Sequence, residues 1–127
     1  MRALLDTHTL IWWLEAPDRL SPRARQMVES QATTVLVSAT PAWEIAIKSR
    51  AGKLEAGPLV ADFGGELQQE GFAELPISAA HATRAGLLEG PLRDPFDRML
   101  IAQAQAENLY IISKDKWIDD YAVRRVW

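Results

Sequence analysis

The chain has 127 residues, 48% hydrophobic and 24% charged, which is the composition of one ordinary globular domain. It lacks cysteine, which excludes disulfides, thiolate metal sites and a cysteine nucleophile. The net charge of −3 argues against a protein that binds nucleic acid through basic residues alone, unless divalent cations offset the acids. Asp6 and His8 interrupt the apolar N-terminus, which argues against a signal peptide, and no apolar run is long enough for a membrane span. We expect one cytoplasmic domain over residues 1–127.

Strands and helices are predicted to alternate along the chain. Short apolar runs predict strands at Arg2–Leu5, Thr34–Ser38, Phe72–Pro76, Leu109–Ile112 and Val123–Val126. Apolar residues at helical spacing predict helices at Thr7–Glu15, Ser21–Ser30, Thr40–Gly52, Leu59–Gln69, Ser78–Glu89 and Pro95–Glu107, with one further turn at Lys116–Asp120. This alternation predicts an α/β fold with a mostly parallel sheet and helices on both faces.

The stretch RDPFDRMLIAQA at residues 93–104 contains two acids at the start of the most apolar helix. Asp94 before Pro95 is typical of a helix N-cap followed by proline at the first helical position. Asp97 lies in the first turn, where the helix dipole favours a negative charge. However, its apolar neighbours predict that Asp97 is partly buried, and a buried carboxylate needs partners.

Further acids are predicted to meet Asp97. Asp6 follows the first strand, Asp115 follows the Leu109–Ile112 strand, and Glu44 lies on the helix after the second strand. Active sites of parallel sheets lie beyond the carboxyl ends of the strands. Converging carboxylates favour Mg²⁺ or Mn²⁺ as a cofactor, and such ions activate water for attack on a phosphodiester. Singly, each acid has an equally good explanation as a helix cap, a solvated acid or a turn residue.

Other polar and aromatic residues give weaker signals. Arg98, Lys48 and Lys114 are candidates for positioning phosphate, as are Arg93 and Lys116. His8 is expected near the pocket and His81 on a solvated helix face. The tryptophans Trp12, Trp13 and Trp43 are mainly core candidates, although Trp12 is also compatible with a partner-binding face.

Three motifs in this order resemble a known family: LLDTHTLIWWL, VSATPAWEIAIKSRAGKL, and RDPFDRMLIAQA followed by IISKD. They resemble PIN domains, and in particular the VapC-like toxins of bacterial type II toxin–antitoxin pairs. The resemblance covers nearly the whole chain. It implies a three-layer α/β/α sandwich, an endoribonuclease dependent on Mg²⁺ or Mn²⁺, a cognate antitoxin and a homodimer.

The resemblance also implies roles for single residues. Asp6, Glu44 and Asp97 match the acids that hold the metal, and Asp115 matches the fourth acid. Asp94 matches an additional acid of uncertain role, and Ser113 matches a Ser/Thr position that bonds into the site. One departure is Leu92, where many relatives have histidine; it puts in question a substrate contact but not the metal site. The antitoxin is expected in a groove lined by Trp12, Trp13 and the Ala42–Ala51 helix.

Two other functions stay open on the sequence. A phosphatase of the haloacid-dehalogenase type would use Asp6 as its nucleophile, but that class needs an acid where this chain has His8. A non-catalytic module that binds RNA or protein would not require all four acids. The expected reaction is hydrolysis of RNA by metal-activated water, leaving 5′-phosphate and 3′-hydroxyl ends. The RNA that is cut is left open.

Overall fold

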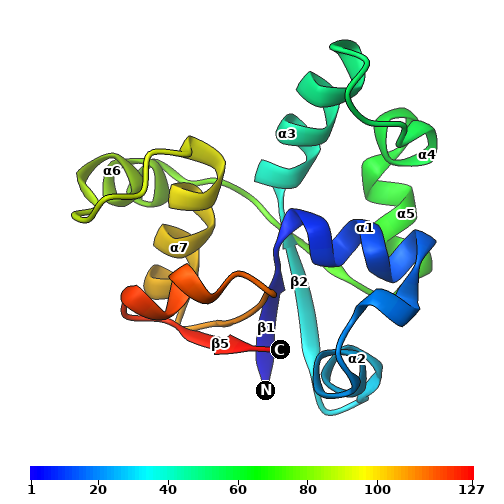
Figure 1. Ribbon diagram of the computed structural model, residues 1–127, viewed down its shortest axis with the longest axis horizontal. Coiled ribbons are helices and arrows are strands. Elements are labelled where there is room, and N and C mark those ends of the chain that lie inside the picture. The colour runs from blue at the N-terminus through cyan, green and yellow to red at the C-terminus, as the bar shows by residue number, and fades with distance from the viewer.

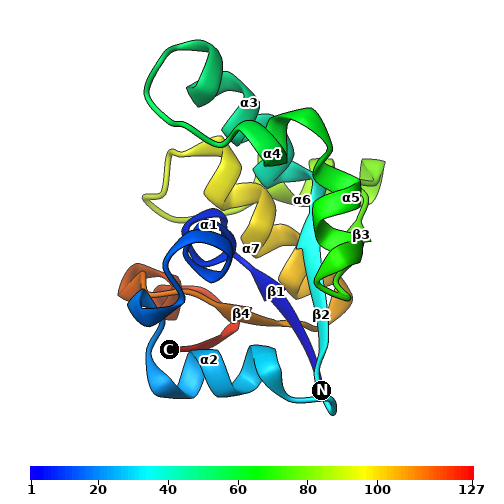
Figure 2. The ribbon, with the colours of Figure 1, turned by 90° about the vertical axis from the view of Figure 1, so that its right-hand side faces the viewer.

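Five parallel strands form one sheet in the order β3-β2-β1-β4-β5 in the computed structural model, which describes residues 1–127 (Figures 1 and 2). Strand β1 is central, with Leu4 opposite Leu36 of β2 on one side and Ile111 of β4 on the other. The strands are β1 (Arg2–Leu5), β2 (Thr34–Ser38), β3 (Ala73–Leu75), β4 (Tyr110–Ile112) and β5 (Arg124–Val126). The predicted strands are therefore confirmed, three of them with shorter ends.

Helices cover both faces of this sheet, which confirms the α/β/α sandwich. Helices α6 and α7 lie on one side of the strands in Figure 1, and α1, α2 and α5 lie on the other. The helices are α1 (Thr7–Glu15), α2 (Pro22–Glu29), α3 (Ala39–Arg50), α4 (Gly57–Ala61), α5 (Phe63–Gln69), α6 (Ala79–Leu87) and α7 (Pro95–Glu107), with 3-10 turns at Pro17–Arg19 and Lys116–Asp120. None of these helices combines the length and apolarity that a membrane crossing needs.

Two hydrophobic clusters lie on opposite faces of the sheet. Along β1, Ala3 and Leu5 belong to the larger cluster beneath α1 and α2, whereas Leu4 belongs to the smaller cluster beneath α7. Strand β2 alternates in the same way, with Leu36 on the α7 side. Successive side chains of a strand point to opposite faces, so these buried strands need apolar residues at every position.

Two helix boundaries differ from the prediction. Helix α3 begins at Ala39 directly after β2, because the Ser38 hydroxyl, rather than Thr40, caps it by accepting the Thr40 N–H at 2.9 Å. The predicted helix Leu59–Gln69 is two helices that meet at Asp62. The Asp62 carboxylate accepts the Gly65 N–H at 3.0 Å, and a Cβ at Gly65 would lie 2.1 Å from that carboxylate. Any larger residue at position 65 would therefore have to displace the exposed Asp62 carboxylate from its present position.

The chain changes direction across the sheet between β1 and β4. After β1 it moves outward to β2 and β3, then returns through α6 and α7 to place β4 on the other side of β1. The carboxyl ends of β1 and β4 therefore border the crevice where ligands bind in open α/β sheets.

Candidate functional site

Asp6 lies at the carboxyl end of β1 and caps α1. Its Oδ1 accepts the backbone N–H of Thr9 at 2.8 Å, so the cap interpretation is confirmed. The Thr9 hydroxyl in turn donates to the carbonyl of Ile112 at 2.9 Å and ties the start of α1 to the end of β4. Asp6 is nevertheless only 7% exposed, and burial raises the pKa of its carboxyl. Capping alone does not compensate its charge.

Glu44 reaches the same edge of the sheet from α3. It is 7% exposed, and its Oε1 accepts a hydrogen bond of 2.7 Å from the Thr7 hydroxyl. Because Thr7 follows Asp6, this bond holds α3 against the end of β1. The other carboxylate oxygen, Oε2, pairs with the ammonium of Lys48 one turn further along α3. Glu44 is therefore the one acid of the group with a cationic partner in the structure.

Asp94 and Asp97 stand at the start of α7. The Asp94 carboxylate accepts the N–H groups of Phe96 at 2.8 Å and Asp97 at 3.1 Å, which confirms it as the N-cap. Asp97 is half-buried, and its pKa is raised to about 7, first by burial and then by the negative charges of Asp94, Glu44, Asp115 and Asp6, in that order. The predicted acids therefore lie close enough to repel one another.

Ser113 and Asp115 follow β4 and complete the group. Ser113 is fully buried, and its hydroxyl oxygen accepts the Asp115 N–H at 3.1 Å. The Ser113 and Thr9 hydroxyls beside Asp6 partly offset the rise in the pKa of its carboxyl, whereas the charge of Asp115 adds to it. Ser113 thus connects the two acids that lie at the ends of neighbouring strands.

The donors of this group are carboxylate and hydroxyl oxygens, which are the ligands that Mg²⁺ and Mn²⁺ prefer. As the side chains stand, no three acidic or histidine residues are grouped closely enough to hold a metal ion. The chemistry fits a hard divalent cation, and Lys48 already places one positive charge against Glu44. Binding of an ion would require Glu44 to release Lys48 and the acids to draw together.

The basic residues predicted to position phosphate have different surroundings. Arg98 donates to the backbone carbonyls of Ala85, Leu88 and Leu92, so its guanidinium holds the loop before α7 and is not free for a phosphate. Lys48 is engaged by Glu44. Lys114, which lies beside Asp115, is exposed and remains free, as are Lys116 and Arg93.

Leu92 also belongs to that loop. Its N–H donates to the Tyr121 hydroxyl at 3.2 Å, and its side chain packs against the smaller hydrophobic cluster. The loop is tight at Gly90, where φ is +120° and an added Cβ would lie 2.6 Å from the Tyr121 oxygen. Leu92 therefore helps to fix the loop that delivers Asp94 and Asp97.

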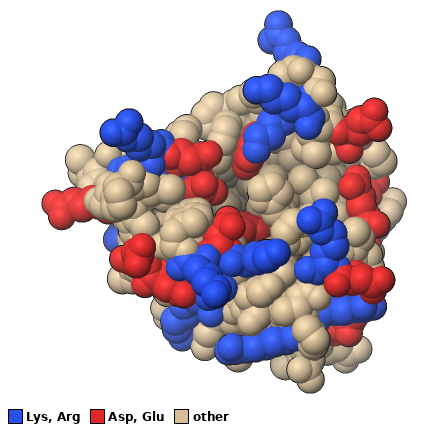
Figure 3. Space-filling model, in the orientation of Figure 1, with Lys and Arg blue, Asp and Glu red and all other residues tan.

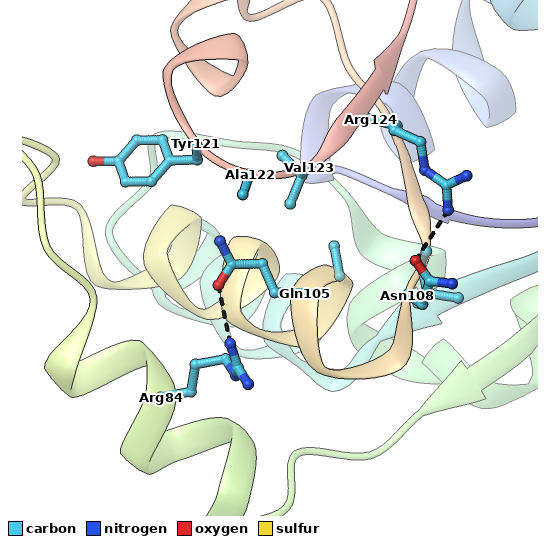
Figure 4. A pocket seen from close by; sticks show the side chains of 9 residues that line it. Arg84, Gln105, Asn108, Tyr121, Ala122, Val123 and Arg124 are labelled. Atoms are coloured by element: carbon cyan, nitrogen blue, oxygen red, sulfur yellow. Dashed lines mark hydrogen bonds between the residues drawn. The ribbon is translucent and has the colours of Figure 1, made fainter.

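Charge is unevenly distributed over this face of the molecule. Figure 3 shows acidic side chains around a central hollow, with lysines and arginines on its rim. A separate hollow of about 530 Å³, shown in Figure 4, lies between α7 and the segment before β5 and contains Arg84, Gln105, Asn108 and Arg124. None of the predicted acids lines that hollow, so it is distinct from the acidic site.

Two side chains, His81 and Trp43, differ from their predicted environment. His81 is 4% exposed rather than solvated, because its ring is inserted between α6 and α7. Trp43 is 55% exposed and is not a core residue, although its ring meets Phe96 edge-on at 4.8 Å. The contacts of Thr7 and Lys48 with Glu44 were not predicted. Only the four-residue spacing of Glu44 and Lys48 could have indicated one of them.

Comparisons with known proteins place the chain in a family. The PIN domain family model matches residues 3–124. Ribonuclease VapC22 of Mycobacterium tuberculosis is 27% identical over 113 residues, which are 89% of this chain and 86% of that protein.

Solved structures share the fold. VapBC2 from Rickettsia felis, bound to a DNA fragment from its promoter, aligns with a TM-score of 0.72 at 14% identity over 99% of this chain and 98% of that one. A toxin–antitoxin complex from Klebsiella pneumoniae aligns with a TM-score of 0.66 at 20% identity over 98% and 96% of the two chains. With the family model spanning nearly its whole length, the chain belongs to the PIN domain family.

Proposed function

We propose that this protein is a divalent-metal-dependent endoribonuclease and the toxin of a toxin–antitoxin pair. The observation that carries the proposal is the group of five carboxylates at the carboxyl edge of the sheet, of which only Glu44 has an ion-pair partner. Such a concentration of negative charge, with Asp6 and Glu44 buried, is costly without a cation. Membership of the PIN domain family and the likeness to Ribonuclease VapC22 support RNA as the substrate.

Asp6, Glu44 and Asp97 would hold Mg²⁺ or Mn²⁺, with Asp115 as a fourth ligand or as a support for attacking water. A bound metal would lower the pKa of the attacking water and would stabilise the negative charge on the phosphate. The Ser113 hydroxyl keeps Asp6 and Asp115 in place, and the Thr7 hydroxyl orients Glu44. Hydrolysis would leave 5′-phosphate and 3′-hydroxyl ends.

A second protein is proposed as the regulator of this activity. The solved relatives include toxin–antitoxin complexes, and the reaction would be damaging to a cytoplasm full of RNA. Trp43 and Ile47 on α3 are 55% and 45% exposed, which is unusual for large apolar residues and suits an antitoxin segment lying along α1 and α3. A homodimer belongs to the same proposal.

The decisive experiment is cleavage of RNA in the presence of Mg²⁺ or Mn²⁺. Asp6→Asn and Asp97→Asn should each reduce the rate at least about 100-fold, because each removes a charged metal ligand. Asp94→Asn is the matched control: it weakens a helix cap, lowers the free energy of unfolding by at most about 0.5–2 kcal/mol, and leaves the folded protein active. Undiminished cleavage by folded Asp6→Asn or Asp97→Asn protein would overturn the proposal.

A further inference from the structure

A second hollow shares a wall with the acidic site. It has a volume of about 760 Å³ and is lined by Lys114, Asp115, Lys116, Trp117, Arg125 and Trp127; we call it the Trp127 hollow. Asp115 belongs to both sites, because its charge acts on the carboxyls of Asp6 and Asp97. A ligand in the Trp127 hollow would therefore reach directly to the acids.

The hollow has three basic side chains beside one acid, Asp115, and two of the three form no ion pair. Lys114 and Lys116 are exposed, and neither forms a salt bridge. Arg125 differs, since Asp119 accepts two hydrogen bonds from its guanidinium at 2.9 and 3.0 Å and the Ser113 carbonyl accepts a third at 3.1 Å. Arg125 is thus a fixed wall that also supports Ser113, whereas the two lysines are free to bind an anion such as phosphate.

Aromatic rings lie beside these lysines. Trp117 and Trp127 are both half-buried, so part of each ring is open to a ligand. Trp127 also contacts Trp12 with ring centres 6.0 Å apart, and Trp12 stacks on His8 at 5.7 Å. The aromatic surface therefore continues from the hollow along α1. Free cations alternating with aromatic rings are typical of surfaces that bind single-stranded nucleic acid.

We propose that the Trp127 hollow binds a single-stranded stretch of RNA adjoining the phosphate that is cut. Lys114 and Lys116 contact the backbone phosphates, and bases stack on Trp117 and Trp127. Only unpaired bases can be splayed onto such rings, so an RNA duplex is excluded from the hollow. The inference rests on the proposed ribonuclease function and adds to it the surface and the residues that hold the RNA beside the phosphate that is cut.

Binding rather than cleavage tests this inference. Fluorescence anisotropy of a labelled RNA oligonucleotide is measured with the Asp97→Asn protein, once with the single strand and once with the strand paired to its complement. We expect the single strand to bind at least about 10-fold more tightly. Trp127→Ala should weaken that binding about 10-fold, and Trp127→Phe should restore most of it because a ring is present again.

The two lysines have a matched control in two arginines, one on α6 and one on β5. Lys114→Ala with Lys116→Ala should weaken single-strand binding and reduce its salt dependence by about 0.7 in log–log slope for each cation lost. Arg84→Ala with Arg124→Ala removes the same charge from the hollow of Figure 4 and should leave both unchanged. This comparison does not depend on Trp127, whose replacement also touches the core.

Three results would overturn the inference. The first is equal binding of duplex and single strand, and the second is equal effects of the lysine and arginine pairs. The third is that the substitutions in the hollow change the molecular mass of the protein in solution but leave its RNA binding intact. The last would identify the surface as a protein interface. Because the assay uses a cleavage-deficient variant, it separates the two proposals. Single-strand binding at the hollow in a protein that cuts no RNA would refute the nuclease and leave the binding surface standing.

Discussion

Two groups of polar side chains adjoin α7, one at its start and one where it packs against α6, and they differ in whether their polar atoms and charges have partners. At the start of the helix, Asp97 faces four other carboxylates, and its pKa is raised to about 7. Between α6 and α7, His81 is more deeply buried than Asp97, but its Nδ1 accepts the Ser78 N–H at 3.1 Å and its Nε2 bonds to Glu107 at 2.9 Å. The ring of His81 therefore has a partner for each nitrogen, whereas the carboxylates at the start of α7 repel one another.

The group around His81 stabilises the fold, whereas the group around Asp97 costs stability and is suited to binding a cation. The Ser78 hydroxyl also accepts the His81 N–H at 3.1 Å, so this pair completes the first turn of α6 while locking it to α7. Gln103 adds its amide to the group, with only its Oε1 left without a partner. Polar groups paired in this way hold a fold together. Buried carboxylates that repel one another cost stability, and the cation that would offset the cost comes from outside the chain.

Replacing His81 tests the hydrogen-bonded group between α6 and α7 and should have the largest effect on stability. His81→Ala removes the bonds to Ser78 and Glu107 and leaves a cavity between two helices, so the free energy of unfolding should fall by about 2–4 kcal/mol. Urea denaturation measures this loss. RNA cleavage per folded molecule should stay the same, because the ring contacts none of the acids of the candidate site.

The other histidine is the control for this prediction. His8 is exposed on α1, and His8→Ala should change the free energy of unfolding by less than about 0.5 kcal/mol. A His81→Ala protein that is as stable as the parent, or that is folded but unable to cleave, would contradict the assignment of His81 to structure.

Local signals were sufficient for much of the fold. The Asp94-Pro95 pair predicted the N-cap of α7, and the apolar runs predicted all five strands, because caps and strand periodicity depend on neighbours in the sequence. Where the same local signals compete, the prediction was wrong: Asp62 ends one helix and caps the next, within a stretch that looked continuous.

Contacts between distant segments were not predictable in this way. Helical spacing did not say that His81 faces α7 or that Trp43 faces solvent, since the face that a helix buries depends on its neighbours in space. For the site, the topology rule predicted that Asp6 and Asp97 approach one another. The hydrogen bond from Thr7 to Glu44, by contrast, joins residues 37 apart and has no sequence signature.

Replacing Asp97 tests the group of carboxylates that repel one another at the start of α7. In protein free of metal, the folded-state pKa of about 7 exceeds the ordinary value of 3.8, so the folded state holds the proton more tightly than the unfolded state does. The contribution of this carboxyl to stability is therefore complete below its ordinary pKa and is lost as the pH rises to about 7. Asp97→Asn removes that loss.

We expect Asp97→Asn to be more stable than the parent by about 1–2 kcal/mol at pH 8 in a chelator, which allows for solvent screening of a partly exposed group. The gain should disappear at low pH, where the parent carboxyl is protonated. Urea denaturation across this pH range gives both values, and Asp18→Asn at an exposed position should show no such trend. A variant that is less stable than the parent at pH 8 would show that Asp97 is compensated within the chain.

Lys48 is the only cation that pairs with a carboxylate of the acidic site. In this one contact the acidic site, like the group around His81, has a partner within the chain. An ammonium on Glu44 competes with a divalent cation for the same oxygen and repels it. Lys48→Met should therefore bind Mg²⁺ about 2–5-fold more tightly; the effect is modest because the lysine side chain is 40% exposed and its ion pair is screened by water. Titration calorimetry with Mg²⁺ alone measures this change without reference to cleavage. Lys53→Met removes the same charge from an exposed lysine beyond the end of α3 and should leave the affinity unchanged. If Lys48→Met binds Mg²⁺ no better than the parent, Glu44 does not take part in holding the ion, and the metal ligands reduce to Asp6, Asp97 and Asp115.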